Sequence, residues 1–295
     1  MNKPALPPAT RESSSIENVL NKLPQLGVGL GYRSPFRTDL FLNQKQVDFL
    51  EITIEHFLHA TPEKEKELEL LQAHFTLIPH GLNLSLGSAE GVNLKYIEQV
   101  ASFLERVEPP WWSEHIAWTQ TDGISIGHLS PVPFSQEALD VIWGNLEQVQ
   151  SIIKTPMILE NITYPFAVPG SELSEEEFLK TLFGEANCGL LLDVTNVFTN
   201  ATNHGYDPYK YLQSLPLNRV VQLHFVGGHW NKDTLIDSHS HPTPPEVWQL
   251  MDKVLESAPV KGAILERDEN LPPFSELVEE MQKAREMGRR FQRWN

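Results

Sequence analysis

Seven short apolar runs in this chain end in a residue that can bind a metal ion. They end at His56, at His80, at the adjacent pair Glu114 and His115, at Glu160, at Asp193, at His224 and at Glu266. Imidazole and carboxylate groups are ligands for divalent iron, manganese and zinc, and carboxylates can bridge two ions. The recurrence indicates that parallel strands deliver these side chains to one rim and build a metal site there.

Two further segments add donors. Asp237 and His239 stand two residues apart in LIDSHSH, so on an extended segment they project the same way and can chelate one ion. Asn196 comes three residues after Asp193, and its amide oxygen can bind a metal or orient the carboxylate. His229 stands in a Gly-flanked segment, where three roles are open: it binds a metal, faces the substrate or faces solvent.

The pair Glu114 and His115 presents a choice, because adjacent residues of a regular strand point to opposite faces. We therefore expect one of the two to reach the centre. Cys188 precedes a strand and is expected at the opposite end of the barrel as a small buried apolar residue, so no cysteine joins the metal site.

Eight strand candidates carry these residues, starting at about residues 27, 49, 75, 112, 157, 190, 220 and 262. Their solid apolar runs are typical of strands that are buried on both faces of a parallel sheet. Helical spacing fills the gaps, for example over residues 96–107, 135–154 and 275–290, and capping patterns stand at Ser174 with Glu177 and at Thr243 with Glu246. The order predicts a single-domain α/β protein, a (β/α)8 TIM barrel over residues 21–295, preceded by a disordered leader over residues 1–20.

The composition narrows the class of protein. The net charge of −16 argues against a nucleic-acid partner, because such proteins usually cluster Lys and Arg. No apolar run reaches the about 18 residues of a transmembrane helix, so no membrane partner is expected. The lone cysteine excludes an internal disulfide, and we expect a cytoplasmic protein.

Ten sequence blocks, from GVGLGYR near residue 27 to ILERDENLPP ending at Pro273, are similar to the multinuclear non-heme iron-dependent oxidase family. That family was long catalogued as a domain of unknown function and includes the oxidase of methanobactin biosynthesis. The resemblance implies a TIM barrel related to endonuclease IV and xylose isomerase. It also implies two or three iron ions, dioxygen as co-substrate, and oxidation of a ribosomally synthesised precursor peptide, at a cysteine, with the help of a separate peptide-recognising partner protein.

The same resemblance implies ligand roles block by block. They fall on His80 in PHG, Glu160 in LEN, Asp193 and Asn196 in DVTN, His224 in QLH, Asp237 and His239 in LIDSH, and Glu266 in ILE. Two departures concern the early strands: many members have SDH where this chain has SEH at Glu114 and His115, and some have a histidine at the position of Thr53. His56 is the candidate substitute for that histidine.

Two other classes of function use similar residues. A hydrolase or isomerase of the endonuclease IV and xylose isomerase superfamily would hold zinc or manganese with the same ligands, but the acidic charge and the lack of a lysine at a strand end weigh against it. A non-catalytic metal-binding protein is the third alternative, and it would not need so many ligands.

Overall fold

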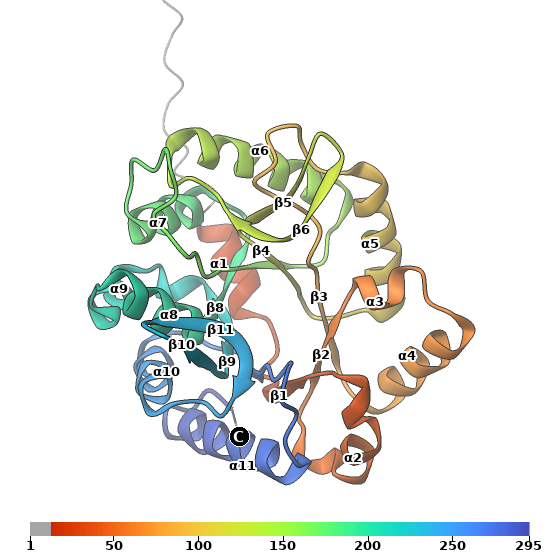
Figure 1. The fold of residues 1–295 in the computed structure, drawn as a ribbon. Helices are drawn as coiled ribbons and strands as arrows, with labels where there is room; N and C mark the ends of the chain where they lie inside the picture. The colour runs from red at the N-terminus through yellow and green to blue at the C-terminus, as the bar shows by residue number, and fades with distance from the viewer. Residues whose placement is uncertain (1–12, 295) are drawn as a thin grey trace, which may run out of the picture.

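Eight parallel strands form a closed barrel in the computed structural model, which describes residues 13–294 (Figure 1). The strands follow one another around the barrel in chain order, and the last pairs with the first. Their bounds are Gly27–Gly31 (β1), Leu50–Thr53 (β2), Leu77–His80 (β3), Trp112–His115 (β4), Met157–Glu160 (β7), Gly189–Asp193 (β8), Val220–Phe225 (β9) and Gly262–Leu265 (β12). The predicted single TIM barrel is confirmed, with each strand at its predicted place.

Helices surround the barrel on the outside, except α1, which lies behind the barrel in this view (Figure 1). Their bounds are Ser13–Asn21 (α1), Arg37–Leu42 (α2), Glu55–Leu58 (α3), Pro62–His74 (α4), Leu94–Val107 (α5), Gln136–Ile152 (α6), Glu175–Glu185 (α7), Val194–His204 (α8), Pro208–Ser214 (α9), Pro245–Ser257 (α10) and Phe274–Arg290 (α11). The capping box predicted at Ser174 forms with Glu177. The one predicted at Thr243 is wrong: α10 begins two residues later, and the Thr243 backbone N–H donates to Glu280 Oε2 at 2.8 Å.

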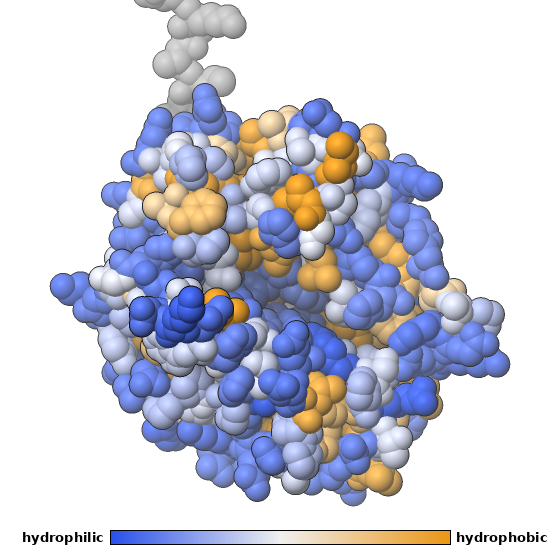
Figure 2. Space-filling view, viewed as in Figure 1, coloured by the Kyte–Doolittle hydropathy of each residue, from blue (hydrophilic) through white to orange (hydrophobic). Residues whose placement is uncertain are grey.

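Two antiparallel hairpins, which the sequence analysis did not predict, extend from strand ends of the barrel. The first joins Ala117–Thr121 (β5) to Ile124–Pro131 (β6), and the second joins Gly227–Asn231 (β10) to Thr234–His241 (β11). Figure 1 shows both beside the barrel mouth, and Figure 2 shows the mouth as a hollow whose floor is hydrophilic. The second hairpin carries Asp237 and His239, so the metal-ligand candidates come from a hairpin as well as from the barrel.

The barrel interior is built in layers, because every second residue of a strand points inward. The lower layer is apolar, and its members form one buried cluster: Phe49, Ile78, Trp111, Ile158, Leu191, Val221 and Ile264. Two positions further along, the same strands place polar residues: Glu51, His80, Ser113, Glu160, Asp193 and Glu266. The candidate site is thus the layer directly above the apolar one.

Two strands depart from this regular step. On β9 the register with β8 shifts between Leu190 and Leu191, so Val221 is an extra residue and Gln222 and His224 face inward after it. On β1 the inward position is Gly29, where a Cβ would lie 2.5 Å from the backbone oxygen of Phe49. Neighbouring strands therefore already fill the space inside β1.

Helix α1 closes the lower end of the barrel, because Ile16 and Leu20 are buried in the same apolar cluster. A disordered leader was predicted over residues 1–20, and the structure differs from residue 13 on. There α1 is helical, and its Ile16 and Leu20 belong to the core. Residues 1–12 of that leader lie outside the described residues. Within residues 13–294, no helix is both long enough and apolar enough to cross a bilayer.

Candidate metal centre

Three groups of His, Asp and Glu side chains lie at the carboxyl ends of the barrel strands. Ligand-type atoms within each group are all within 4.8 Å of one another. The groups are His80, His115 and Glu160; Glu160, Asp193, His224 and Glu266; and His239, Glu266 and Asp268. Because Glu160 and Glu266 each belong to two groups, the three groups form one continuous chain of donors.

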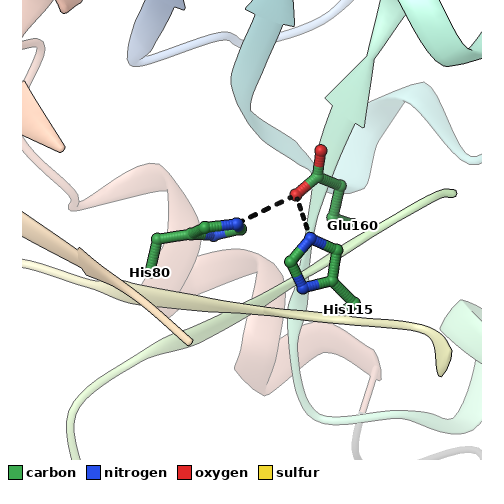
Figure 3. Close-up of side chains that lie close together, drawn as sticks. All are labelled: His80, His115 and Glu160. Atoms are coloured by element: carbon green, nitrogen blue, oxygen red, sulfur yellow. Dashed lines mark ion pairs between the residues drawn. The ribbon is translucent and has the colours of Figure 1, made fainter. Parts of the chain in front are cut away.

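The first group joins strands β3, β4 and β7 (Figure 3). Glu160 Oε2 lies 3.5 Å from His80 Nε2 and 3.2 Å from His115 Nε2. The other ring nitrogens are held from outside the group: His80 Nδ1 lies 2.7 Å from Ser113 Oγ, and His115 Nδ1 lies 3.0 Å from the Gly81 carbonyl oxygen. Such partners fix the orientation of metal-binding imidazoles, so both rings present Nε2 to the same point.

The second group is the most buried. His224 is fully buried, and its Nδ1 lies 3.1 Å from Glu160 Oε1 and 3.0 Å from Glu266 Oε2. Asp193 is the N-cap of α8: its Oδ1 accepts the Asn196 backbone N–H at 2.8 Å, which leaves Oδ2 free to bind an ion. The cap therefore sets the direction of this carboxylate.

The third group combines β12 with the β10–β11 hairpin. His239 Nε2 lies 2.9 Å from Asp237 Oδ1, so the predicted two-residue chelating pair does meet. On its other side His239 Nδ1 lies 3.5 Å from Glu266 Oε2 and 3.3 Å from Asp268 Oδ2. His239 has a φ of 50°, a left-handed backbone that is uncommon outside glycine, and this conformation turns the ring toward the barrel.

A buried polar chain supports His224 from below. Glu51 Oε2 lies 2.9 Å from His224 Nε2 and accepts a hydrogen bond from Gln222 Nε2 at 2.6 Å. Gln222 Oε1 in turn accepts the Trp111 indole N–H at 2.9 Å. This chain occupies the Nε2 side of His224, so Nδ1 is the nitrogen that faces the other donors.

The charges of the centre shift its pKa values strongly. Burial alone would raise the pKa of Glu160, but His224 and His115 hold it well below its usual range. Burial alone would lower the pKa of His115, but Glu160 and Glu114 raise it to about 10. Burial, then the charges of Glu160 and Asp237, raise the pKa of Asp193 well above its usual range. The metal-free centre therefore holds protons that a bound cation would displace.

Donor atoms without hydrogen bonds mark where cations would fit. Asp193 Oδ2 and Asn196 Oδ1 are buried without a hydrogen-bond partner, and Glu160 Oε2, Asp237 Oδ1 and His239 Nδ1 make only the ion-pair contacts given above. A buried polar atom without a partner is costly, and a cation at the centre would relieve that cost. The nitrogen and oxygen donor set suits iron, manganese or zinc. The residues present thus fit a metal centre.

Some predicted ligands do not join the three groups. His56 is exposed on α3, because the chain turns into this helix directly after β2. Glu114 faces away from the barrel axis, where its Oε1 accepts the Leu84 backbone N–H at 2.7 Å, so His115 is the member of that pair that reaches the centre. His229 is exposed, and its Nδ1 lies 2.8 Å from Ser238 Oγ.

Two acidic residues at the centre were not predicted from the sequence. Glu51 lies inside β2, two positions after Phe49, and the layered spacing of the other strands is the signal that could have found it. Asp268 lies in the loop after β12, two positions after Glu266, and pairs with Arg33. Arg33 lies 3.7 Å from Glu266 as well, which places one positive charge beside the acidic donors.

Comparisons with known proteins agree with this picture. The family model of the RiPP precursor modification enzymes MbnB/TglH/ChrH matches residues 27–289. A UPF0276 protein of Caulobacter vibrioides strain NA1000 / CB15N is 34% identical over 260 residues, which make up 88% of this chain and 93% of that protein. The UPF0276 protein ACIAD0933 of Acinetobacter baylyi is 35% identical over 265 residues, 89% of this chain and 91% of that protein.

Solved structures with the same fold include sugar-converting enzymes. D-psicose 3-epimerase from Clostridium cellulolyticum H10 superposes with a TM-score of 0.57 at 10% identity, over 90% of this chain and 99% of the epimerase. A putative xylose isomerase from Rhodospirillum rubrum gives a TM-score of 0.53 at 11% identity, over 90% of this chain and 99% of the isomerase. At these identities the likeness is one of barrel fold alone.

Proposed function

Because the chain belongs to the family of RiPP precursor modification enzymes MbnB/TglH/ChrH, we propose that it oxidises a ribosomally synthesised precursor peptide, at a cysteine, with dioxygen and two or three iron ions. The observation that carries the multinuclear part is the sharing of Glu160 between the first and second donor groups and of Glu266 between the second and third. A carboxylate shared in this way can bridge two cations. The reaction also involves a separate peptide-recognising partner protein, as the resemblance implies.

The proposed ligands follow the three groups. His80, His115 and Glu160 hold one ion, and Glu160, Asp193, His224 and Glu266 hold a second. His239, Glu266 and Asp268 are available to a third, with Asp237 beside His239 and Asn196 beside Asp193. Iron at these positions would supply redox chemistry with dioxygen and would accept the substrate thiolate as a ligand.

The chain's own residues do the rest of the work. The Nδ1 contacts of His80 and His115 keep their Nε2 atoms aimed at one point, and Glu51 does the same for His224 from the opposite side. The apolar layer below the centre excludes water from beneath, so substrate reaches the donors from the barrel mouth. The thiol must lose its proton to become a ligand, and carboxylates of the centre are the nearest bases for it.

The test is metal analysis of protein purified without oxygen, combined with Mössbauer spectroscopy and mass spectrometry of a peptide encoded near the gene. We expect more than one iron per chain, and a change in peptide mass that requires oxygen. His224→Ala should lose iron, whereas Cys188→Ala should keep it, because Cys188 is fully buried at the opposite end of β8. Stoichiometric zinc together with failure to bind iron would overturn the proposal.

A further inference from the structure

Apart from the hollow at the barrel mouth, a cavity lies outside the barrel. It lies between the loop that follows β7, the start of α7 and helices α8 and α9. Its volume is about 530 Å³, within the usual range of small-ligand pockets. Figure 1 shows α7, α8 and α9 along one side of the barrel. None of the three donor groups of the metal centre contributes a residue to its lining.

Aromatic rings form much of the wall of this cavity. The Tyr164 ring stacks on His204 with a centroid distance of 4.4 Å, and it meets Phe134 at 5.6 Å. Tyr206 and Tyr211 also line the cavity, with ring centroids 5.4 Å apart. The faces of such rings carry partial negative charge, which attracts cations.

A buried carboxylate, Glu175, also lines the cavity. The side chain is 7% exposed, and its Oε2 accepts the Tyr164 hydroxyl at 3.0 Å. No basic side chain among residues 13–294 forms an ion pair with it, and burial raises its pKa to about 7. A buried carboxylate without a positive partner is costly, so a cation entering the cavity would relieve that cost.

Tyrosine hydroxyls gather around this carboxylate. Burial and then the charge of Glu175 raise the pKa of both Tyr206 and Tyr211, which places their hydroxyls close to it. Glu176 and Asp207 also line the cavity, against one lysine, Lys210, which is exposed on α9. The lining is therefore acidic as well as aromatic.

We propose that this aromatic, acid-lined cavity binds the ammonium or guanidinium group of a lysine or arginine side chain in the precursor peptide. The carboxylate of Glu175 supplies the counter-charge and the tyrosine faces surround the cation, as in aromatic cages for basic groups. Naming the peptide as the source of the cation rests on the proposed function.

The cavity is close enough to the metal centre for one peptide to reach both. Tyr164 follows Glu160 by four residues, and an extended chain of that length spans at most about 14 Å. The connecting segment runs beside the centre, because Thr163 Oγ1 donates to Asp237 Oδ2 at 3.3 Å. A peptide segment of about four extended residues is therefore long enough to reach from the centre to Tyr164.

The binding step can be tested without catalysis. Ligand-observed NMR with the full-length protein would use N-acetyl-lysine methylamide and N-acetyl-arginine methylamide, and N-acetyl-norleucine methylamide as the neutral control. We expect the two basic probes to bind at least about tenfold more tightly than the neutral one, and Glu175→Gln to remove that difference. Glu172→Gln, which neutralises an exposed glutamate near the cavity, should leave it unchanged.

Equal binding of the three probes would overturn the proposal. Binding of the basic probes only in Lys210→Met would also overturn it, because the lysine of the chain itself would then be the occupant. The assignment to the peptide is tested next: Glu175→Gln should raise KM for a precursor peptide with little change in kcat. If the probes bind but KM is unchanged, the peptide is not the source of the cation, and the metal chemistry stands or falls separately.

Discussion

Replacing Glu51 by glutamine tests how the barrel prepares a metal ligand. Glu51 Oε2 is the acceptor that faces both His224 Nε2, at 2.9 Å, and Gln222 Nε2, at 2.6 Å. A glutamine can keep a carbonyl oxygen at that point, so neither donor loses its partner, but the acceptor loses its charge. The change therefore isolates the effect of a charged acceptor on the imidazole that would bind the metal.

The size of the effect follows from the two kinds of hydrogen bond. A bond to a charged group contributes about 1.5–3 kcal/mol and one between neutral groups about 0.5–1.5 kcal/mol, so the loss at His224 is about 1–2 kcal/mol. That corresponds to roughly five- to thirtyfold weaker metal binding. Glu51→Ala is harsher, because two buried donors lose their acceptor, and the free energy of unfolding should fall by about 2–6 kcal/mol.

The assay is an anaerobic titration with Fe(II) in competition with a chelator, paired with thermal unfolding of the metal-free protein. Glu67→Gln is the matched control, because Glu67 is a buried glutamate on α4 that pairs with Lys64 and Tyr32, outside the three donor groups. Metal affinity should drop in Glu51→Gln and not in Glu67→Gln. Unchanged iron affinity in Glu51→Gln would show that the charge of Glu51 does not prepare His224.

Three further outcomes are expected. Burial raises the pKa of Glu175 to about 7 in the folded protein, against a usual 4.5, so the folded state binds a proton that the unfolded state has lost. The free energy of unfolding should therefore fall by about 3 kcal/mol as the pH rises from 4.5 to 7. Glu175→Gln should remove this contribution when chemical unfolding is measured at several pH values. His115→Ala should lose iron in metal analysis while His56→Ala retains it, and equal loss would show that the exposed histidine also binds. Cys188, whose pKa burial raises to about 12, should resist a thiol reagent in the native protein and react once it is unfolded; fast native labelling would contradict its burial.

The barrel itself was readable from the sequence because its strands are buried on both faces and appear as solid apolar runs, such as the one ending at Asp193. The ligands at strand ends followed from the same pattern. The hairpins were not readable, since β10 and β11 pair with an irregular register between Gly227 and His229, and His239 of β11 meets Asp268 in a distant loop. His56 was expected at the centre because the apolar run reads on to it, but the chain turns into α3 directly after β2.

Glu51 could have been predicted from the spacing of residues within the strands, although it does not stand at a strand end. The chain places a polar residue two positions beyond an apolar one on strand after strand, and Phe49 with Glu51 obeys that rule inside a run that otherwise looks like core. The rule becomes visible only when the strands are aligned by their inward residues, and that alignment requires the register of the sheet. Asp268 had no comparable signal, because it lies in an irregular loop after β12.

Helix α1 covers the end of the barrel opposite the mouth. Ile16 and Leu20 lie beneath the apolar layer, and Leu20 comes so near β8 that a Cβ on Gly189 would meet it at 3.2 Å. The family match begins at residue 27, so the folded unit reaches back beyond the shared region. Removing α1 would take Ile16 and Leu20 from the cluster and expose the apolar layer, at about 1.5–3 kcal/mol for each aliphatic residue lost. Water could then approach the polar layer from both ends, and the chemistry at the mouth would depend on a helix at the opposite end of the barrel.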